Sequence, residues 1–321
     1  MKRAFVTGGS GFVGKELIAA LAARGVEVRA LARSEKAAIA VRGVGAHPVR
    51  GDLADQAAMA EGMDECDVVF HAAANVSEHG KLADHLRDTV DGTKNTLSAA
   101  QSAQVKRFVH VGTEAVLADG KPIVRADETV PYPAKPAGPY PIAKGLAERA
   151  VIAANTLAFE TMSIRPRFIW GRGDTSLLPK LTEAVKKGRF GWIGGGHYLT
   201  STCHVVNVVE GALLAAEKGK GGEIYFLTDG EPVDFREFLT KYLATQGVDA
   251  SGSRNVPRWL ASTTATLTAW MKEPPVSKTA IALVGGEVTV VDAKARKELG
   301  YKGTMTREAG LAEMKPVSPA A

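Results

Sequence analysis

Thr7–Gly14, with the sequence TGGSGFVG, decides the fold of this chain. An apolar run precedes it, and Phe12–Arg24 continues it with apolar residues recurring on one helical face. Gly8 allows a tight turn, Gly11 lets the backbone approach a pyrophosphate, and Gly14 lets the helix pack closely on the strand. The segment therefore predicts a strand, a glycine turn and a helix whose first N–H groups face phosphates. The predicted phosphate-binding residues are Gly8, Ser10, Gly11, Phe12, Val13 and Gly14.

Strands and helices alternate after this unit. We expect further strands at Val26–Arg33, Ala46–Arg50, Val68–His71, Arg107–Val111, Thr161–Arg165 and Glu223–Thr228, and helices at Thr89–Gln104 and Tyr140–Ala154. The proline-rich stretch Lys121–Gly138 is expected to be a loop. Such alternation is typical of an α/β protein. The predicted fold is a Rossmann-type, doubly wound parallel sheet with a smaller C-terminal substrate-binding region.

The expected dinucleotide-binding core covers residues 1–165, and residues 205–229 return to it. Residues 166–204 and 230–314 form the expected substrate-binding region, and residues 315–321 a loose tail. Trp259–Met271 is apolar and rich in threonine, which favours a lid helix over a pocket rather than a segment lying against a membrane.

The composition narrows the possible functions. The chain has 321 residues, of which 45% are hydrophobic and 23% charged, as in an ordinary globular protein. The net charge of +5 is scattered, so nucleic-acid binding is not expected. Cys66 and Cys203 fit no metal spacing and are expected to be buried, reduced thiols. No secretory signal or membrane-spanning run is visible, and we expect a cytoplasmic protein without a metal.

The end of the second strand indicates which dinucleotide is bound. A site for NAD usually carries an acidic residue there, which binds the ribose 2′-hydroxyl, but this sequence continues with Ala30–Arg33. Arg33 follows Gly14 by 19 residues and can pair with a 2′-phosphate, with Lys36 assisting. NADP(H) is therefore the preferred cofactor. NAD(H) stays open, because Glu35 offers an alternative contact to the ribose.

Tyr140 and Lys144 lie four residues apart on a predicted helix and project from one face. A carbonyl that receives a hydride also needs a proton, which a phenol can supply. A neighbouring ammonium favours the phenolate and lowers the pKa of the tyrosine, which the reverse reaction requires. Tyr140 and Lys144 are the predicted catalytic pair, and Thr113, just after a strand, is the candidate to bind the substrate oxygen.

These motifs resemble the extended short-chain dehydrogenase/reductases over nearly the whole chain. The resemblance also rests on HAAA at His71–Ala74, VDGTKN at Val90–Asn95 and RPRFIWGRGD at Arg165–Asp174. It is strongest to the branch of 3β-hydroxysteroid dehydrogenases and dihydroflavonol reductases. Two positions depart from the family pattern, because Gly112 and Thr89 stand where many members have Ser and Asn.

The resemblance implies roles for matching positions. Lys144 would also bind the nicotinamide ribose, while His71 and His110 are expected to be structural. The further cofactor contacts that it implies are Asp52, Leu53, Ala72, Ala73, Ala74 and Arg167. Candidates to line the substrate region are Trp192, glycines 194–196, His197, Tyr198 and His204, and Asn207 is expected to fix a turn or helix start near the cofactor.

Three functions compete. The first is an NADP(H)-dependent oxidoreductase that interconverts a hydroxyl and a carbonyl on a small, mainly apolar substrate, such as a steroid-like, flavonoid-like or alkyl compound. The second is a nucleotide-sugar epimerase with tightly bound NAD, against which Arg33 argues. The third is a non-catalytic NADP(H)-binding sensor, in which the Tyr140–Lys144 pair would have no use. A dehydratase lacks support because the acid–base pair after Thr113 is incomplete. By analogy, a homodimer would form through the helices at Thr89–Gln104 and Tyr140–Ala154.

Overall fold

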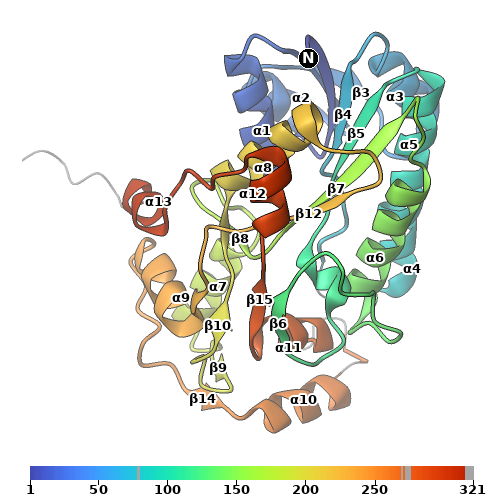
Figure 1. The fold of residues 1–321 in the computed structure, drawn as a ribbon. Coiled ribbons are helices and arrows are strands. Elements are labelled where there is room, and N and C mark those ends of the chain that lie inside the picture. The colour runs from blue at the N-terminus through green and yellow to red at the C-terminus, as the bar shows by residue number, and fades with distance from the viewer. Residues whose placement is uncertain (78–79, 269, 272–275, 315–321) are drawn as a thin grey trace, which may run out of the picture.

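A seven-stranded parallel sheet forms the centre of the molecule (Figure 1). The computed structural model describes residues 1–77, 80–268, 270–271 and 276–314. The strand order is β12-β7-β5-β4-β1-β2-β3. The strands are β1 (Arg3–Thr7), β2 (Glu27–Ala32), β3 (Ala46–Arg50), β4 (Val68–His71), β5 (Arg107–Val111), β7 (Glu160–Pro166) and β12 (Ile224–Leu227). All neighbouring pairs are parallel, which confirms the predicted sheet.

Helices cover both faces of this sheet. One layer contains α1 (Phe12–Ala23), α8 (Val205–Lys218) and α12 (Ala293–Leu299), and the other contains α3 (Gln56–Gly62), α5 (Gly92–Ser102) and α6 (Pro139–Ala153). The short helix α2 (Glu35–Arg42) packs beside β2 and β3. This doubly wound arrangement confirms the predicted fold class.

The site follows from the strand order. The chain order reverses between β1 and β4, and ligands of open α/β sheets bind beyond the carboxyl ends of the strands at such a point. The register pairs Thr7 with His71 and His71 with His110, so the ends of β1, β4 and β5 lie side by side. The first glycine turn, the HAAA segment and Thr113 all follow directly from these three ends.

A smaller part lies beyond the carboxyl ends of the strands, in the lower half of Figure 1. Its sheet has the order β13-β10-β15-β6, with β13 (Val233–Asp234), β10 (Leu199–Thr200), β15 (Val288–Val290) and β6 (Ile123–Ala126). Around it lie α7 (Leu178–Lys186), α9 (Phe235–Ala244), α10 (Arg258–Leu267), α11 (Lys278–Val284), α13 (Arg307–Glu313) and the short strands β8 (Ile169–Trp170), β9 (Trp192–Ile193), β11 (Cys203–His204) and β14 (Asn255–Val256). Aromatic side chains form much of its core, among them Phe168, Trp170, Trp192, Phe235, Phe238 and Tyr242.

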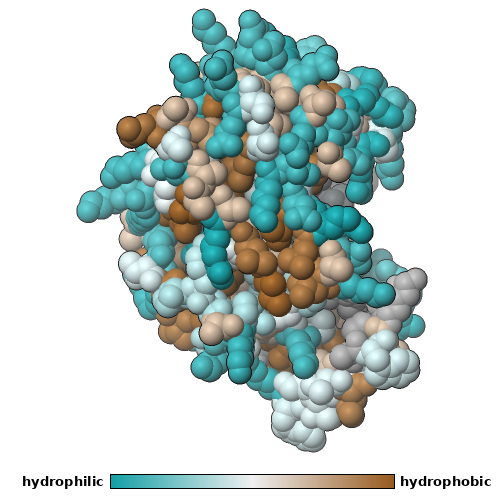
Figure 2. Space-filling view, turned by 90° about the vertical axis from the view of Figure 1, so that its right-hand side faces the viewer, coloured by the Kyte–Doolittle hydropathy of each residue, from teal (hydrophilic) through white to brown (hydrophobic). Residues whose placement is uncertain are grey.

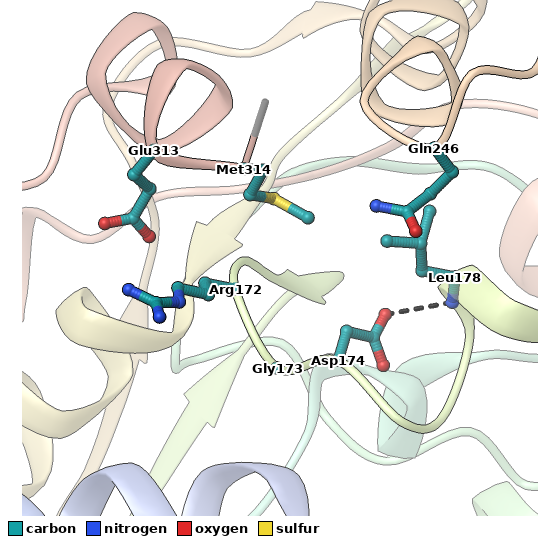
Figure 3. Close-up of a pocket in the computed structure, with 7 residues that line it drawn as sticks. All are labelled: Arg172, Gly173, Asp174, Leu178, Gln246, Glu313 and Met314. Atoms are coloured by element: carbon teal, nitrogen blue, oxygen red, sulfur yellow. Dashed lines mark hydrogen bonds between the residues drawn. The ribbon is translucent and has the colours of Figure 1, made fainter. Parts of the chain in front are cut away.

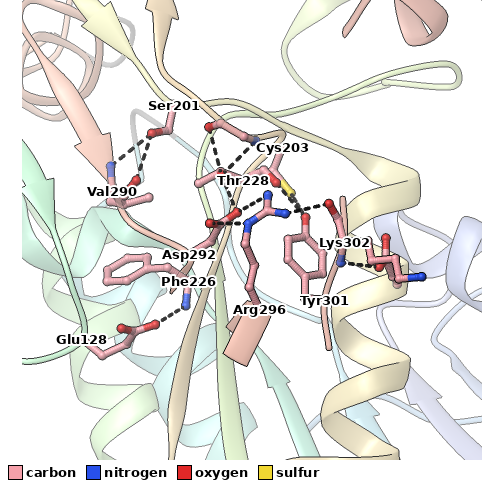
Figure 4. A network of polar contacts seen from close by, with 12 residues as sticks. Glu128, Ser201, Cys203, Phe226, Thr228, Val290, Asp292, Arg296, Tyr301 and Lys302 are labelled. Carbon is pink, nitrogen blue, oxygen red and sulfur yellow. Dashed lines mark hydrogen bonds and ion pairs between the residues drawn. The ribbon is translucent and has the colours of Figure 1, made fainter. Parts of the chain in front are cut away.

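A polar network joins this smaller part and the C-terminal segment to the large sheet (Figure 4). Asp292 accepts a hydrogen bond from Thr228 at 2.7 Å and pairs with Arg296 at 2.8 Å. The Tyr301 hydroxyl donates to the carbonyl of Thr228 at 2.8 Å. Ser201 bonds to the backbone of Val290. These bonds fix the chain after β12 at the edge of the large sheet.

Three local predictions were wrong or incomplete. The expected loop Lys121–Gly138 contains β6, because its backbone pairs with β15 from a distant part of the sequence. The expected helix Thr89–Gln104 begins as part of a π-helix, Leu86–Asp91, before α5. The expected helix Trp259–Met271 is shorter, since α10 ends at Leu267 and residue 269 lies outside the described residues. The expected tail, residues 315–321, also lies outside them.

The two cysteines and the lengths of the helices were also the subject of expectations from the sequence. Cys66 and Cys203 are buried free thiols, as predicted. Within the described ranges no helix is long and apolar enough to cross a membrane.

Candidate functional site

The glycine turn after β1 leaves room for a ligand backbone. Gly8 has a φ of 71°, and a Cβ at this position would lie 2.7 Å from the carbonyl carbon of Ala72. A Cβ at Gly14 would lie 2.2 Å from the carbonyl oxygen of Gly8. At the N-terminus of α1, Gly11 is the N-cap with no side chain to cap it, and the first turn holds no acidic residue. Free N–H groups and the helix dipole therefore favour an anion here.

At the end of β2, Arg33 is exposed and has no ion pair among the described residues, and the same is true of Lys36. Glu35, the alternative ribose contact, is paired with Arg42 at 3.2 Å and with Arg50 at 3.3 Å. The arginine is thus available to an anionic ligand, whereas the glutamate already has cationic partners.

The HAAA segment borders the turn. Ala72, Ala73 and Ala74 are partly exposed, and the N–H of Ala73 lies 3.4 Å from the Thr7 hydroxyl. His71 is fully buried between the hydroxyls of Thr7 at 2.7 Å and Thr93 at 2.9 Å. Burial lowers its pKa to about 3, so the ring is neutral at physiological pH and holds strands and helix together.

The remaining predicted cofactor contacts surround this turn. Ser10 and Gly11 are exposed, and Phe12 and Val13 are partly exposed on the first turn of α1. Asp52 is exposed after β3 and accepts a hydrogen bond from the N–H of Ala54 at 2.8 Å. Leu53 is partly buried, and its carbonyl accepts from Asn95 at 2.9 Å.

Tyr140 and Lys144 lie on the first two turns of α6. Pro139 at the first helical position has a φ suited to a helix start and needs no N–H partner there. The Lys144 side chain is 3% exposed, and its Nζ donates to the carbonyl of Val111 at 2.8 Å and contacts Nε2 of His110 at 3.3 Å. Tyr140 is only partly buried. The helix therefore presents a phenol and an anchored amine at the end of β5.

The pKa shifts of this pair differ from the expected pattern. Burial raises the pKa of Tyr140, and the charge of Glu114 raises it further, while a hydrogen bond with Thr113 acts in the opposite direction. Burial lowers the pKa of Lys144 to about 8, although the charge of Glu148 opposes this. Desolvation and the charge of Glu114 therefore outweigh any lowering of the tyrosine pKa by the lysine in this structure.

Thr113 belongs to a buried polar chain. Its hydroxyl donates to the Glu114 carboxylate at 2.8 Å, and that carboxylate pairs with Arg167 at 3.0 Å. The guanidinium of Arg167 also donates to the carbonyl of Leu283 on α11 at 2.6 Å. Thr113 thus contacts both the Glu114 carboxylate and the Tyr140 hydroxyl. Arg167, an expected cofactor contact, instead binds groups of the protein, although its Nε has no partner in the described structure.

Gly112 departs from the family pattern for a packing reason. A Cβ at this position would lie 2.7 Å from the Ser163 hydroxyl and 2.9 Å from the Glu148 carboxylate. That carboxylate forms a buried ion pair with Arg165 at 2.6 Å. The side chain that other members carry here has no room beside this pair.

Two histidines next to the catalytic pair were not predicted as site residues. His110, expected to be structural, touches Lys144. His85, at the end of α4 (Leu82–His85), packs edge-on against Tyr140 with ring centroids 6.3 Å apart. His85 directly precedes the π-helix, so its place beside Tyr140 could be predicted only by someone who already knew of that helix. No local sequence signal marks that helix.

The predicted substrate-side residues are mostly packing residues. Trp192 and His204 are at most 1% exposed. The Asn207 side chain forms hydrogen bonds with the Asp229 carboxylate and with the backbone of Met305. Tyr198 stacks on Phe235 and donates to the carbonyl of Val284. His197 is exposed beside Asp234. These contacts explain their aromatic and polar character without a substrate.

Two surface cavities lie away from the catalytic pair. One of about 400 Å³ is lined by Arg172, Asp174 and Glu313 among others, between the loop after β8 and α13 (Figure 3). The other, of about 740 Å³, lies on the outer side of α6 and includes Ile142 and Leu146. Figure 2 shows an apolar patch on this face of the molecule. Neither cavity is lined by Thr113, Tyr140 or Lys144.

Comparisons with known proteins identify the family of this chain. Residues 5–258 match the 3-beta hydroxysteroid dehydrogenase/isomerase family. A 4-hydroxy-2-methyl-3-oxo-4-farnesyl-3,4-dihydroquinoline-1-oxide ketoreductase from Stigmatella aurantiaca is 50% identical, over 99% of this chain and 97% of the relative. A decarboxylating sterol-4-alpha-carboxylate 3-dehydrogenase from Dictyostelium discoideum is 32% identical, over 98% of this chain and 100% of the relative.

The fold is also found among solved structures. A dTDP-glucose 4,6-dehydratase from Streptomyces venezuelae, with NAD bound, superposes with a TM-score of 0.78. It is 24% identical and covers 97% of this chain and 95% of its own. At this identity the likeness concerns the fold alone.

Proposed function

Because the chain belongs to the 3-beta hydroxysteroid dehydrogenase/isomerase family, which is a family of oxidoreductases, we propose that it is an NADP(H)-dependent reductase or dehydrogenase. It interconverts a hydroxyl and a carbonyl on a small, mainly apolar substrate. One observation carries the proposal. Tyr140 and the anchored Lys144 lie one helical turn apart beside Thr113, at the strand ends that also hold the glycine turn.

The residues of the turn fit a dinucleotide. Gly8 and Gly14 provide space that a Cβ would fill, the start of α1 offers N–H groups to the pyrophosphate, and Arg33 is available for a 2′-phosphate. Asp52, Leu53 and Ala72–Ala74 border the same turn and would contact the adenosine and ribose. A bound nicotinamide dinucleotide supplies or takes up the hydride.

The chain's own residues handle the proton. Tyr140 donates its phenolic proton to the oxygen of the carbonyl being reduced, and the Lys144 ammonium stabilises the phenolate that remains. Thr113 is hydrogen-bonded to Tyr140, and this contact favours the phenolate by lowering the pKa of the tyrosine. In the absence of substrate, burial and the Glu114 carboxylate keep Tyr140 protonated, which is the state that ketone reduction needs.

The names of two relatives support an apolar substrate. One describes a farnesylated dihydroquinoline oxide and the other a sterol carboxylate, and both reactions concern a carbonyl or hydroxyl on a hydrophobic ring. The smaller part with its aromatic core, which lies beyond the strand ends, would provide the substrate side. We also propose that two copies of the chain join through α5 and α6, and α6 contributes the exposed apolar side chain of Leu146 to this face.

Isotope transfer tests the function directly. The protein is incubated with NADPH carrying deuterium at C4 and with a panel of steroid-like, flavonoid-like and long-chain ketones. We expect an alcohol that carries deuterium on its carbinol carbon. A protein that purifies with NAD bound and transforms nucleotide sugars without net cofactor consumption would contradict the proposal and indicate an epimerase.

A further inference from the structure

The amine of Lys144 has two fixed acceptors, and both belong to the last two residues of β5. The carbonyl of Val111 lies 2.8 Å from Nζ, and Nε2 of His110 lies 3.3 Å from it. A charged lysine has three N–H donors. Two of them are therefore engaged by one strand, and the third is left for the site.

The ring of His110 is committed to this contact. It is completely buried, and burial together with the charge of Lys144 keeps its pKa well below the usual value, so the ring is neutral. If Nε2 accepts from the lysine, the ring proton must be on Nδ1. Nδ1 has no hydrogen-bond partner in the described structure. A buried donor without a partner is unfavourable and calls for an explanation.

His71 shows how a structural histidine is accommodated at the same level. It is the register partner of His110 on β4, and the two rings stack with centroids 5.5 Å apart. Both ring nitrogens of His71 bind threonine hydroxyls, and neither contacts Lys144. The sheet can thus bury a fully satisfied histidine at this depth. His110 differs in that its one bonded nitrogen is directed at the catalytic lysine.

We propose that His110 is a positioning residue for the catalytic pair. Together with the Val111 carbonyl it fixes the direction of the Lys144 amine and favours its charged form. This inference rests on the proposed function, in which that charge stabilises the Tyr140 phenolate. The titratable groups that interact with Lys144 are Glu148 on its own helix, His110 on β5 and His71 on β4, and Tyr140 lies one helical turn before it.

The pH profile of alcohol oxidation tests the role, because oxidation requires the phenolate. In His110→Leu the lysine loses an acceptor, its charged form is less favoured, and the phenolate is less stable. We expect the acidic limb of kcat to move up by about one pH unit and kcat at pH 7 to fall about tenfold. His110→Gln, whose side-chain oxygen can accept from Nζ, should restore the limb. His71→Leu is the matched control and should lower stability without moving the limb.

A spectroscopic test needs no turnover. In ¹⁵N-histidine spectra of the cofactor-free protein, we expect His110 to be protonated on Nδ1, and Lys144→Met to shift its Nε2 resonance. Two results would overturn the positioning role: a His110 ring that is protonated on Nε2, or a His110→Leu variant whose acidic limb of kcat lies at the same pH as in the wild type. A failure of the proposed function would be seen in a different variant. If Tyr140 did not transfer the proton, Tyr140→Phe would keep the turnover of the wild type.

Discussion

Arg33 is the residue on which cofactor choice depends in this account. Its exposed guanidinium has no ion pair in the described structure, and a charge-assisted contact to a 2′-phosphate is strong. We expect Arg33→Asp to raise the Kd of NADPH about 10- to 100-fold while that of NADH changes much less. Fluorescence titration with each dinucleotide measures both.

Arg24→Asp is the control for this change. It alters the net charge equally, but Arg24 follows the far end of α1 and pairs with Glu217. Both dinucleotides should bind to this variant as to the wild type. An unchanged ratio of NADPH to NADH affinity in Arg33→Asp would refute the assigned role.

Single-residue environments were the part of the site that sequence could predict least. The spacing of Tyr140 and Lys144 indicates a shared helix face, and the structure agrees. The sequence alone gives no sign that the Thr113 hydroxyl donates to Glu114 or that His110 contacts the lysine. Both facts depend on partners distant in sequence, such as Arg167, and on burial that sets the pKa values.

At the scale of elements, the join between β1 and α1 is the most sensitive to substitution. A Cβ at Gly14 would lie 2.2 Å from the Gly8 carbonyl oxygen, so either the helix or the phosphate turn must move. We expect Gly14→Ala to cost about 2 kcal/mol or more in the free energy of unfolding and to abolish dinucleotide binding. Thermal and urea unfolding measure the first effect and titration the second.

Gly252→Ala provides the comparison for that variant. A Cβ at Gly252 meets no atom within 4 Å, so stability should change by less than about 0.5 kcal/mol. If Gly14→Ala behaved like Gly252→Ala, the tight packing of α1 on the glycine turn would not be needed for binding.

The strands and helices of the large sheet could be predicted because their signals are local. Apolar runs bounded by glycine mark β1 and β2, and an apolar face marks α1. β6 was missed because its pairing with β15 joins residues more than 150 positions apart, within a stretch whose prolines indicate a loop. The π-helix before α5 arises from tertiary packing, and periodicity cannot distinguish it from an α-helix.

For the whole molecule, two neutral histidines in the middle of the sheet link stability to pH. Burial lowers the pKa of His71 from 6.5 to about 3, and that of His110 lies well below its usual value. The unfolded chain therefore binds more protons than the native protein below about pH 6.5. We expect the free energy of unfolding to fall from pH 6.5 toward pH 5, by up to about 1.4 kcal/mol per pH unit for each histidine.

Urea unfolding at several pH values measures this dependence. His71→Gln removes one of these groups, so its slope should be smaller, whereas His47→Gln changes an exposed ring and should keep the full slope. A wild-type protein with no loss of stability between pH 6.5 and pH 5 would contradict the neutral, buried state of both rings.

The order of the segments along the chain also belongs to this scale. Residues 205–229 supply α8 and β12, which pack on the large sheet, while the flanking segments build the smaller part. The division into a cofactor domain and a substrate domain remains a prediction, since it concerns how the two parts function.

The central claim is that Tyr140 transfers the proton, and single-turnover reduction with Tyr140→Phe tests it most directly. Phenylalanine preserves the ring that packs against His85 and removes only the hydroxyl. NADPH affinity should stay within about twofold of the wild-type value, and the rate of the chemical step should fall by about 10²–10⁴-fold. A variant that binds NADPH and still reduces the ketone at the wild-type rate would contradict the account.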